Sequence, residues 1–399
     1  MTLLAEILLW ACLAALLHTY IFYPFLLWLL ARGKQNNELV YRREADLPAV
    51  SVIMSVYNEA KVVDAKMRSL SAQDYPADQL AFFIGSDCSV DGTDAIMRQW
   101  ADADRRVHFF RFPRRRGKPQ VLNELVGLAL QRRPPSSGHV LLITDANVML
   151  SREVIRRLAA HFRRESIAIV DAHMVHTGMT ADDISRAENA YIFSEVRLKH
   201  REGIVWRKMI GPFGGCYALR STFFSPIPEN FLVDDFYVAM RAFEHGGDAI
   251  SELGAVCYEA VSHEIREEYR RKARISAGNF QNLVTFRHLW WPPADALGFA
   301  FFSHKVLRWC GPFFLVGLLA ASTVLALKGN IFYRTLLLIT TGVLLGLPAI
   351  DYLLKTLKIN ILLLRGIRYF SIMNLALLEG FVKFAKGITT NVWEPPKRH

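Results

Sequence analysis

The sequence predicts an α/β protein whose central domain is built on a doubly wound, mostly parallel sheet, with transmembrane helices at both ends of the chain. Short runs that are apolar on both faces alternate with helical patterns through the central part, which is typical of buried parallel strands joined by helices. Uncharged stretches lie near both ends of the 399 residues. With 52% hydrophobic residues, 24 Gly and 16 Pro, the composition excludes a disordered or collagen-like chain.

The first uncharged stretch covers residues 7–31, which are 25 consecutive positions without Asp, Glu, Lys or Arg. A helix needs only ~20 residues to cross the ~30 Å hydrocarbon core of a bilayer. A cleaved signal peptide is the alternative, but no basic segment precedes the stretch, and it is too long for the apolar core of such a peptide. We therefore expect an uncleaved transmembrane anchor over residues 1–32.

Apolar character returns in the last quarter of the chain. Residues 309–327 and 335–350 carry no charge, and residues 369–378 form a shorter uncharged run. We expect a C-terminal transmembrane region over residues 309–390, followed by a tail over residues 391–399.

Two segments near these runs are less regular. Glu379, Lys383 and Lys386 interrupt the last run, which is predicted either to span imperfectly or to be re-entrant. Residues 283–308 mix Trp and Pro with basic side chains, a pattern suited to an interfacial amphipathic helix in the headgroup layer.

Basic residues cluster after the first and the third apolar stretch. They are Arg32, Lys34, Arg42 and Arg43, and then Lys355, Lys358, Arg365 and Arg368. Because basic residues flank membrane spans on the cytoplasmic side, we expect a multi-pass protein of the inner (cytoplasmic) membrane whose central block, residues 48–282, is cytosolic. The five cysteines form no Cys-x-x-Cys pair, which suits a reducing cytosol and indicates no zinc site.

The central block is predicted to contain the sheet and its helices. Five apolar runs are predicted as strands, over residues 49–57, 80–85, 107–112, 139–144 and 167–171. Helical patterns follow them, one ending at Gln73, one beginning near Thr93, and two over residues 117–131 and 151–163. We expect the last helix to open with Ser151 as its N-cap and to have Glu153 in its first turn.

Polar residues follow three of the predicted strands at their carboxyl ends. The three clusters are Tyr57-Asn58-Glu59, Ser86-Asp87 and Asp145-Ala146-Asn147. In an open α/β sheet, ligands bind beyond the carboxyl ends of the strands. A carboxylate after a strand is more often only a helix cap or a turn residue, but three clusters at equivalent positions predict one shared cleft.

Asp145 and Asn147 are two residues apart at the end of an extended strand, so their side chains point the same way. Together they can present two hard oxygen atoms to one cation. Such donors suit Mg²⁺ or Mn²⁺, which bind through one or two protein oxygens and complete their coordination with substrate phosphates. The sequence therefore predicts a divalent cation, with a nucleoside diphosphate as its natural partner.

The ordered motifs of the chain resemble those of a known family. They are VSVIMSVYNEA, SDCSVDGT, RRGKPQVLNE, TDAN, GPFGGCYALR, VDDF and RRKARI. This order resembles the membrane-embedded family 2 glycosyltransferases with a GT-A fold, the group that holds cellulose, hyaluronan, chitin and poly-N-acetylglucosamine synthases. The resemblance covers nearly the whole chain and implies a Rossmann-like GT-A domain between membrane helices.

The resemblance implies which residues contact the nucleotide. Tyr57 and Glu59 would line the nucleoside end, and Asp87 would hydrogen-bond the uracil. Lys118 would lie near the nucleotide. Arg271 replaces the Gln of the family's Gln-x-x-Arg-Trp motif and would lie in the nucleotide site.

The resemblance also implies the metal ligands and the sugar pocket. Asp145 and Asn147 would hold the metal, although the family usually has Asp-x-Asp there, so that Asn147 removes one negative charge. Gly214 and Gly215 would form a small-residue wall against which sugar and acceptor pack. Glycine suits a close approach of the backbone, although a plain turn explains these residues almost as well.

Asp234 and Asp235 match the acidic pair of the family, whose second member is the general base. An acceptor hydroxyl is a poor nucleophile until a carboxylate takes its proton, so Asp235 would be that base. Asp234 would cap a helix beside the acceptor pocket. Arg274 matches the Arg of the Gln-x-x-Arg-Trp motif and would stabilise the departing diphosphate together with the metal.

The resemblance implies an inverting, metal-dependent hexosyltransferase that uses a nucleotide sugar, expected to be a UDP-sugar, to extend a surface or exported polysaccharide. Ile275, however, stands in the acceptor pocket where processive relatives place Trp, whose ring stacks on the terminal sugar of the polymer. Transfer of one or a few sugars to a lipid-linked acceptor is therefore the alternative within the same chemistry.

Two features of the sequence bear on other classes of function. Basic residues interleaved with aromatic ones over residues 105–118 suggest a nucleic-acid surface, but attraction to anionic membrane lipids and to the donor diphosphate explains the same net charge of +11. A catalytically inactive membrane scaffold is hard to reconcile with the presence of Asp87, Asp145, Asp235 and Arg274. We expect no nucleic-acid partner, and a homo-oligomer is left open.

Overall fold

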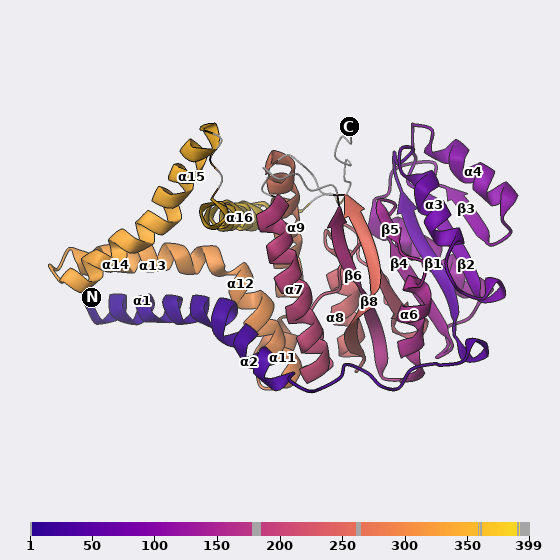
Figure 1. The fold of residues 1–399 in the computed structure, drawn as a ribbon, viewed down its shortest axis with the longest axis horizontal. Helices are drawn as coiled ribbons and strands as arrows, with labels where there is room; N and C mark the ends of the chain where they lie inside the picture. Colours follow the sequence, from indigo (N-terminus) through magenta and orange to yellow (C-terminus); the bar gives the residue numbers. More distant parts are fainter. Residues whose placement is uncertain are drawn as a thin grey trace. The chain divides into compact units, whose positions relative to one another are not determined.

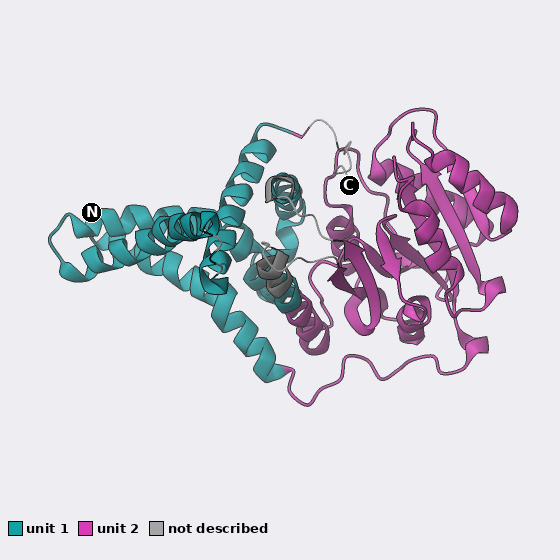
Figure 2. Ribbon diagram, turned by 45° about the horizontal axis from the view of Figure 1, so that its top comes forward, with its two compact units in different colours: residues 1–30, 179–195, 262–387 teal, residues 31–178, 196–261, 388–399 magenta. Residues whose placement is uncertain are grey.

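The computed structural model describes residues 2–177, 185–260, 265–357, 359, 361–388 and 391. By its internal contacts the chain divides into two compact units, shown in different colours in Figure 2. The helical unit contains residues 1–30, 179–195 and 262–387, and the sheet unit contains residues 31–178, 196–261 and 388–399. The helical unit includes residues 179–195 and 262–282 of the predicted cytosolic domain, residues 48–282, and the domain bounds stay a prediction.

The sheet unit is built on eight strands in the order β3-β2-β1-β4-β7-β6-β8-β5 (Figure 1). The strands are β1 (Ala49–Val56), β2 (Leu80–Ser86), β3 (Val107–Arg111), β4 (His139–Thr144), β5 (Val148–Leu150), β6 (Ile167–Thr177), β7 (Cys216–Arg220) and β8 (Asp248–Ala260). The five strands predicted from apolar runs are all present, as β1, β2, β3, β4 and β6.

The sheet is mixed: parallel pairs predominate, and two strands run antiparallel to their neighbours. β1 pairs in parallel with β2 and β4, and β2 pairs in parallel with β3. β7 runs antiparallel between β4 and β6, β5 pairs antiparallel with β8, and β6 and β8 are parallel. The prediction holds for the part formed by β3, β2, β1 and β4. The antiparallel pairs involve β5, which has three residues, and β7, which forms the end of the motif GPFGGCYALR. Neither of these strands was predicted, and nor was β8.

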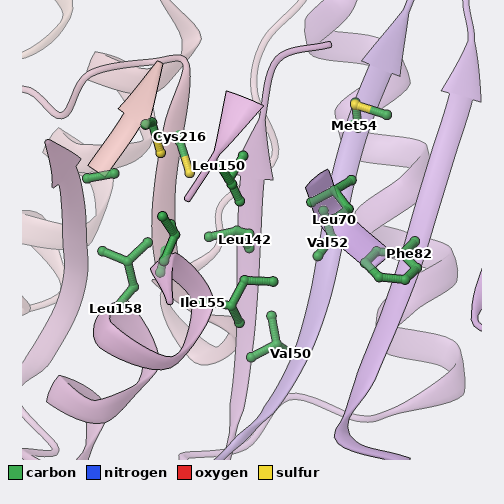
Figure 3. Close-up of a cluster of buried hydrophobic side chains, with 14 of the residues drawn as sticks. Val50, Val52, Met54, Leu70, Phe82, Leu142, Leu150, Ile155, Leu158 and Cys216 are labelled. Carbon is green, nitrogen blue, oxygen red and sulfur yellow. The ribbon is translucent and has the colours of Figure 1, made fainter. Parts of the chain in front are cut away.

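Alternate residues of β1 face opposite sides of the sheet, as the pleat of a strand requires. Residues on one side join a large buried apolar cluster with the helices α3 (Val63–Ser71), α4 (Thr93–Ala103) and α6 (Val154–Ala160). Figure 3 shows Val50 and Val52 of β1 within this cluster. Burial of such side chains contributes about 1.5–3 kcal/mol each.

The other side of the sheet is covered by α5 (Lys118–Arg132), most of whose apolar residues are buried. The contact is close at β2, where a Cβ on Gly85 would lie 2.7 Å from Cγ1 of Val121. Glycine at this position therefore lets α5 approach the strand. Lys118 is the first residue of α5. The packing of α5 on the strand therefore also fixes the position of Lys118 relative to the sheet.

The predicted Ser151 N-cap is wrong, because α6 begins at Val154 and its N-cap is Glu153, with no side-chain capping hydrogen bond. The backbone N–H of Ser151 donates to the carbonyl of Val256 at 3.1 Å, and the carbonyl of Ser151 accepts from Gln73 Nε2 at 2.8 Å. The backbone of Ser151 is thus hydrogen-bonded to β8 and to Gln73, and the helix begins only three residues later.

The helical unit contains the long apolar helices. They are α1 (Thr2–Leu17), α2 (Tyr23–Leu30), α13 (Gly311–Ala326), α14 (Ile331–Thr341), α15 (Leu347–Thr356) and α16 (Leu362–Ala385). Leu9 and Cys12 of α1 form a buried cluster with Leu318 and Leu325 of α13. Gly317 makes this approach possible, because a Cβ there would lie 2.9 Å from Sγ of Cys12.

Among the described residues, two helical stretches are long and apolar enough to cross a membrane, Thr2–Leu30 and Ile331–Thr356. Residues 296–309 and 311–326 form a pair bent by 62°, which would make a third span if the pair crosses as one. α16 is not among these candidates. It carries Arg365 and Arg368, and Arg368 Nε lies 2.6 Å from Oδ2 of the buried Asp351.

Residues 283–308, predicted as an interfacial segment, include the short helices α10 (Arg287–Trp290) and α11 (Ala296–Phe301). Three basic side chains that follow α11 contact one acidic residue of the helical unit. Glu195 of α7 (Ser185–Trp206) accepts hydrogen bonds from His304 Nε2 at 2.9 Å and Arg308 Nη1 at 2.5 Å, and from Lys305 Nζ at 2.5 Å. His304 is fully buried.

The helix α9 (Ile265–Thr285) packs along α16, which explains why residues 262–282 belong to the helical unit. Ser276 Oγ donates to the carbonyl of Leu377 at 2.8 Å. A Cβ on Gly380 would lie only 2.3 Å from Cβ of Ser276, so glycine is required for this close helix pair. The sequence pattern could not reveal this packing, because the bonded residues are 101 positions apart in the chain.

Candidate active site

The three predicted polar clusters lie at the same edge of the sheet. Val56 is the register partner of Ser86 in the parallel pair β1–β2, and Ile53 is the partner of Ile143 in the pair β1–β4. Parallel strands in this register end together. The residues that follow β1, β2 and β4 therefore begin at neighbouring positions of one edge.

Asp87 follows β2 and organises the loop that precedes α5. Its Oδ1 accepts a hydrogen bond from the backbone N–H of Arg116 at 2.6 Å, and its Oδ2 accepts from the N–H of Gly117 at 3.0 Å. The Arg115 guanidinium lies 3.8 Å from Oδ2 and 3.5 Å from the centre of the Tyr57 ring. Asp87 is almost fully buried. The structure thus brings Tyr57, Asp87 and the loop around Lys118 together.

Glu59 lies in the turn after β1. Its backbone N–H donates to Oγ1 of Thr93 at 2.8 Å, and the N–H of Asn58 donates to Oγ of Ser89 at 3.1 Å. Asn58 has a positive φ of 53°, a conformation that Asn tolerates better than most residues. The turns after β1 and β2 are therefore joined by side-chain hydrogen bonds.

Lys118 is the first residue of α5, and its ammonium group lies among carboxylates. Nζ donates to Oδ1 of Asp145 at 2.7 Å and lies 3.7 Å from Oδ2 of Asp234. Burial lowers the pKa of Lys118, but the negative charges of Asp145, Asp234 and Asp235 outweigh that effect and raise it. Lys118 therefore stays charged and links the turn after β4 to the start of α8 (Asp234–Glu244).

Asp235 occupies the first turn of α8 next to Asp234. Burial and the neighbouring charge of Asp234 raise the pKa of Asp235 to about 7, and Lys118 partly opposes this rise. A Cβ on Gly214 would lie 2.8 Å from Oδ2 of Asp235, so glycine lets the carboxyl group lie directly against the backbone. Near neutral pH, Asp235 can therefore exist in both the protonated and the ionised form.

The loop that holds Gly214 and Gly215 is fixed by a buried ion pair. Asp171 of β6 accepts from Lys199 Nζ at 2.7 Å with Oδ2 and from the backbone N–H of Phe213 at 2.8 Å with Oδ1. The carbonyl of Gly215 in turn accepts from the N–H of Asp145 at 3.0 Å. The glycine loop and the turn after β4 are thus held together, although no motif indicated Asp171 or Lys199.

Asp145 and Asn147 form the turn between β4 and β5. Asp145 is about one-third exposed, and Asn147 Nδ2 donates to Oε1 of Glu259 on β8 at 2.9 Å. Within the described part of the chain, no three His, Cys, Asp or Glu side chains are arranged to hold a metal ion. One carboxylate and one amide oxygen nevertheless fit Mg²⁺ or Mn²⁺, which bind through few protein ligands and substrate phosphates.

A fully buried lysine, Lys66 of α3, forms hydrogen bonds to both ends of this turn. Its Nζ donates to Oγ1 of Thr144 at 2.8 Å and to the carbonyl of Val148 at 2.5 Å. Burial lowers the pKa of Lys66 to about 8. The sequence did not single out Lys66. It does lie on the same helix face as Val63 and Met67, and this spacing indicates a buried position.

The three remaining predicted site residues, Arg271, Arg274 and Ile275, lie on α9 in the helical unit. Arg271 Nε donates to Oε2 of Glu268 at 2.8 Å, one turn earlier on the same helix. Their predicted roles toward nucleotide and acceptor remain predictions. The other predicted site residues all belong to the sheet unit.

Two family models match the chain. The model of glycosyl transferase family 2 matches residues 51–225, and the model of glycosyl transferase family group 2 matches residues 139–353, which is more than half of the chain. The chain belongs to this glycosyltransferase family. The edge with Asp87, Lys118, Asp145 and Asp235 lies within the matched residues.

One solved structure and two curated sequences are similar to this glycosyltransferase. A solved structure, described as a mannosyltransferase from Pyrobaculum calidifontis in complex with GDP-mannose and Mn²⁺, aligns with a TM-score of 0.68 and 21% identity, covering 95% of this chain and 99% of that one. This likeness shows the GT-A-like fold. Beta-monoglucosyldiacylglycerol synthases of Trichormus variabilis and of a Nostoc species are each 25% identical over 134 residues, which is 33% of this chain and only 27% of theirs.

The pKa of Asp235 leads to a stability prediction. Between pH 3.8 and about 7 the folded glycosyltransferase keeps a proton on Asp235 that the unfolded chain has lost, so the free energy of unfolding falls as pH rises through this window. Asp235→Asn removes the ionisation. We expect this variant to be more stable than the wild type at pH 8, with a gain of at most about 4 kcal/mol, and to lose that advantage progressively toward pH 4.

The measurement is thermal unfolding in detergent at several pH values. Asp102→Asn, at an exposed position of α4, is the control and should follow the wild type at every pH. A stability difference between Asp235→Asn and the wild type that does not grow with pH would contradict the raised pKa.

Proposed function

We propose that this glycosyltransferase transfers a hexose from a nucleotide sugar to an acceptor hydroxyl with inversion at the anomeric carbon, at the cytoplasmic face of a membrane. The observation that carries the proposal is the position of Asp235. It lies beside Gly214, with its pKa near 7, in the same group of charges as Lys118 and Asp145. A carboxylate with such a pKa suits a general base that works near neutral pH.

In the proposed reaction, Asp235 takes the proton of the acceptor hydroxyl as that oxygen attacks the anomeric carbon. The bond between that carbon and the diphosphate breaks on the opposite face, so one displacement inverts the configuration. Asp234 raises the basicity of Asp235 through its negative charge, and Lys118 limits that rise. Gly214 lets the carboxylate of Asp235 lie directly against the backbone.

Asp145 and Asn147 would hold a divalent cation. When bound, Mg²⁺ or Mn²⁺ would offset the negative charge of the departing diphosphate. The neighbouring ammonium of Lys118 is held by Asp145 and can turn toward the same phosphates. The Mn²⁺ in the mannosyltransferase structure supports a divalent cation in this fold, without deciding between the two metals.

The remaining predicted residues complete the donor site in this proposal. Tyr57, Glu59 and Asp87 would contact the nucleoside, and Arg271 and Arg274 of α9 would contact the phosphates. Both oxygens of Asp87 already accept backbone hydrogen bonds, but each carboxylate oxygen has a further lone pair for a base N–H. A uridine nucleotide fits this interpretation, and the guanosine nucleotide of the mannosyltransferase is the alternative.

We propose that the acceptor is a membrane lipid rather than a long polysaccharide. Ile275 offers no aromatic ring for stacking on a polymer end, and the partial similarity to glucosyldiacylglycerol synthases points to a glycolipid product. Extension of an exported polysaccharide remains the second candidate, supported by the motif order alone.

The apolar helices support membrane insertion. Thr2–Leu30 and Ile331–Thr356 would span the bilayer, and basic residues 32, 34, 42 and 43 after the first span would place the sheet unit in the cytosol. A multi-pass protein of the cytoplasmic membrane would meet a soluble donor and a lipid acceptor at one surface. Anionic lipids would also attract its positive charge.

The general-base role predicts the behaviour of Asp235→Asn in catalysis. We expect the transfer rate to fall by about 10²–10⁴-fold, because the amide cannot take the acceptor proton, while the affinity for the nucleotide stays near the wild-type value. Turnover and calorimetric nucleotide binding are measured on the same preparation, with Asp102→Asn as the control. Wild-type turnover in Asp235→Asn would contradict the assignment.

The metal site predicts a separate effect of Asp145→Ala. Binding of UDP or GDP, whichever the wild type takes, should be strengthened by Mn²⁺ in the wild type and indifferent to Mn²⁺ in the variant, because its one carboxylate ligand is gone. Calorimetric titrations with and without Mn²⁺ give the answer. If Mn²⁺ stimulates binding equally in both proteins, the cation is held elsewhere.

The acceptor is tested by product analysis. Purified protein is incubated with labelled nucleotide sugars and with either diacylglycerol vesicles or saccharide acceptors. We expect the label in a solvent-extractable product that carries one or a few sugars. A water-soluble polymer of high mass would favour the polysaccharide candidate, and a failure to release nucleotide from any donor would contradict transferase activity altogether.

A further inference from the structure

The second residue of the proposed cation turn is an asparagine, and its side chain can be used in two ways. A carboxylate presents oxygen on both sides, whereas an amide presents oxygen on one side and an NH₂ group on the other. Only the oxygen can bind a cation. Whether Asn147 helps to hold a metal therefore depends on what determines the orientation of its amide.

Glu259 of β8 determines that orientation. Asn147 Nδ2 donates to Oε1 of Glu259 at 2.9 Å. An ionised carboxylate only accepts hydrogen bonds, so the NH₂ end of Asn147 must face it, and a flipped amide would set two oxygen atoms against each other. The opposite end of the amide, which carries Oδ1, is thereby turned away from Glu259. Oδ1 is thus the end of the amide that is available to a cation.

The sheet holds Glu259 in place. Val148, the residue after Asn147, is the antiparallel register partner of Glu259, and His176 of β6 is its parallel partner on the other side. His176 Nε2 lies 3.6 Å from Oε2 of Glu259, and the ring is buried. The carboxylate therefore stands between an amide and an imidazole, and its charge lies one hydrogen bond from the proposed cation turn.

We propose that Glu259 is a positioning residue for the divalent cation: it orients Asn147 with its oxygen toward the metal and supplies, from behind, the negative charge that an aspartate at position 147 would carry. The inference rests on the proposed function, since it needs a cation at Asp145 and Asn147. Partners behind metal ligands typically change metal affinity by about 10–100-fold when mutated.

The test compares Mn²⁺ affinity in four proteins, the wild type, Glu259→Gln, Asn147→Asp and the double variant. Free Mn²⁺ is measured by electron paramagnetic resonance in the presence of saturating UDP or GDP. Glu259→Gln should weaken Mn²⁺ binding by about 10–100-fold, because glutamine tolerates either amide orientation and carries no charge. In the Asn147→Asp background the same substitution should strengthen binding, because the new amide can donate to the new carboxylate, whereas the native Glu259 would repel it.

The reversal of sign distinguishes positioning from a merely structural hydrogen bond. Glu252→Gln is the matched control, since Glu252 is also on β8 but is bonded to His161 at 2.7 Å instead of to Asn147. It should leave Mn²⁺ affinity unchanged. Thermal unfolding of every variant shows that the fold is retained.

Three results would overturn the proposal. Equal Mn²⁺ affinity in wild type and Glu259→Gln, or the same loss in both backgrounds, refutes the role of Glu259 and leaves the proposed function standing. A wild type that binds no Mn²⁺ with either nucleotide refutes the cation site itself, and with it this inference.

Discussion

The site depends on one ammonium group placed against three carboxylates. Lys118 contacts Asp145 and Asp234 and lies within the electrostatic reach of Asp235. Like charges near the edge of a sheet repel one another where water is partly excluded, and one partly exposed cation between them offsets part of this cost. Lys118 therefore joins, through its charge, the turn after β4, the start of α5 and the start of α8.

The loops around this centre are held mainly by polar side chains. Asp87 binds two backbone N–H groups of the loop before α5, Asp171 binds the N–H of Phe213, and Lys66 binds both ends of the turn that contains Asp145. Hydrogen bonds of charged groups are directional and contribute about 1.5–3 kcal/mol each. Each loop is thus fixed in one geometry, which apolar contacts alone would not specify.

Charges are also paired within the helical unit. Its basic residues at positions 304, 305 and 308 converge on Glu195, and Arg368 pairs with the buried Asp351. These pairs explain how segments that carry charge can pack among apolar helices.

Much of the sheet and of its functional edge could be predicted from the sequence. The five apolar runs became strands, and Tyr57, Asp87 and Asp145 follow three of them at the same edge. These features are local, since a strand is recognised by its own apolar residues and its end by the polar residues that follow. The short β5 and the antiparallel β7 escaped prediction, because a strand of three residues has no detectable period and pairing direction is set by distant neighbours.

The sequence by itself determined the residue types at this edge of the sheet, including Lys118 and the turn over residues 145–147, and it determined which stretches are apolar enough for a membrane. Only the tertiary structure decided which groups touch. It joined Asp171 to Phe213, 42 residues away, and Glu259 to Asn147, 112 residues away. The folded surroundings also raise the pKa of Asp235, through burial and the charge of Asp234. Burial of a single side chain cannot be read from the order of residues alone.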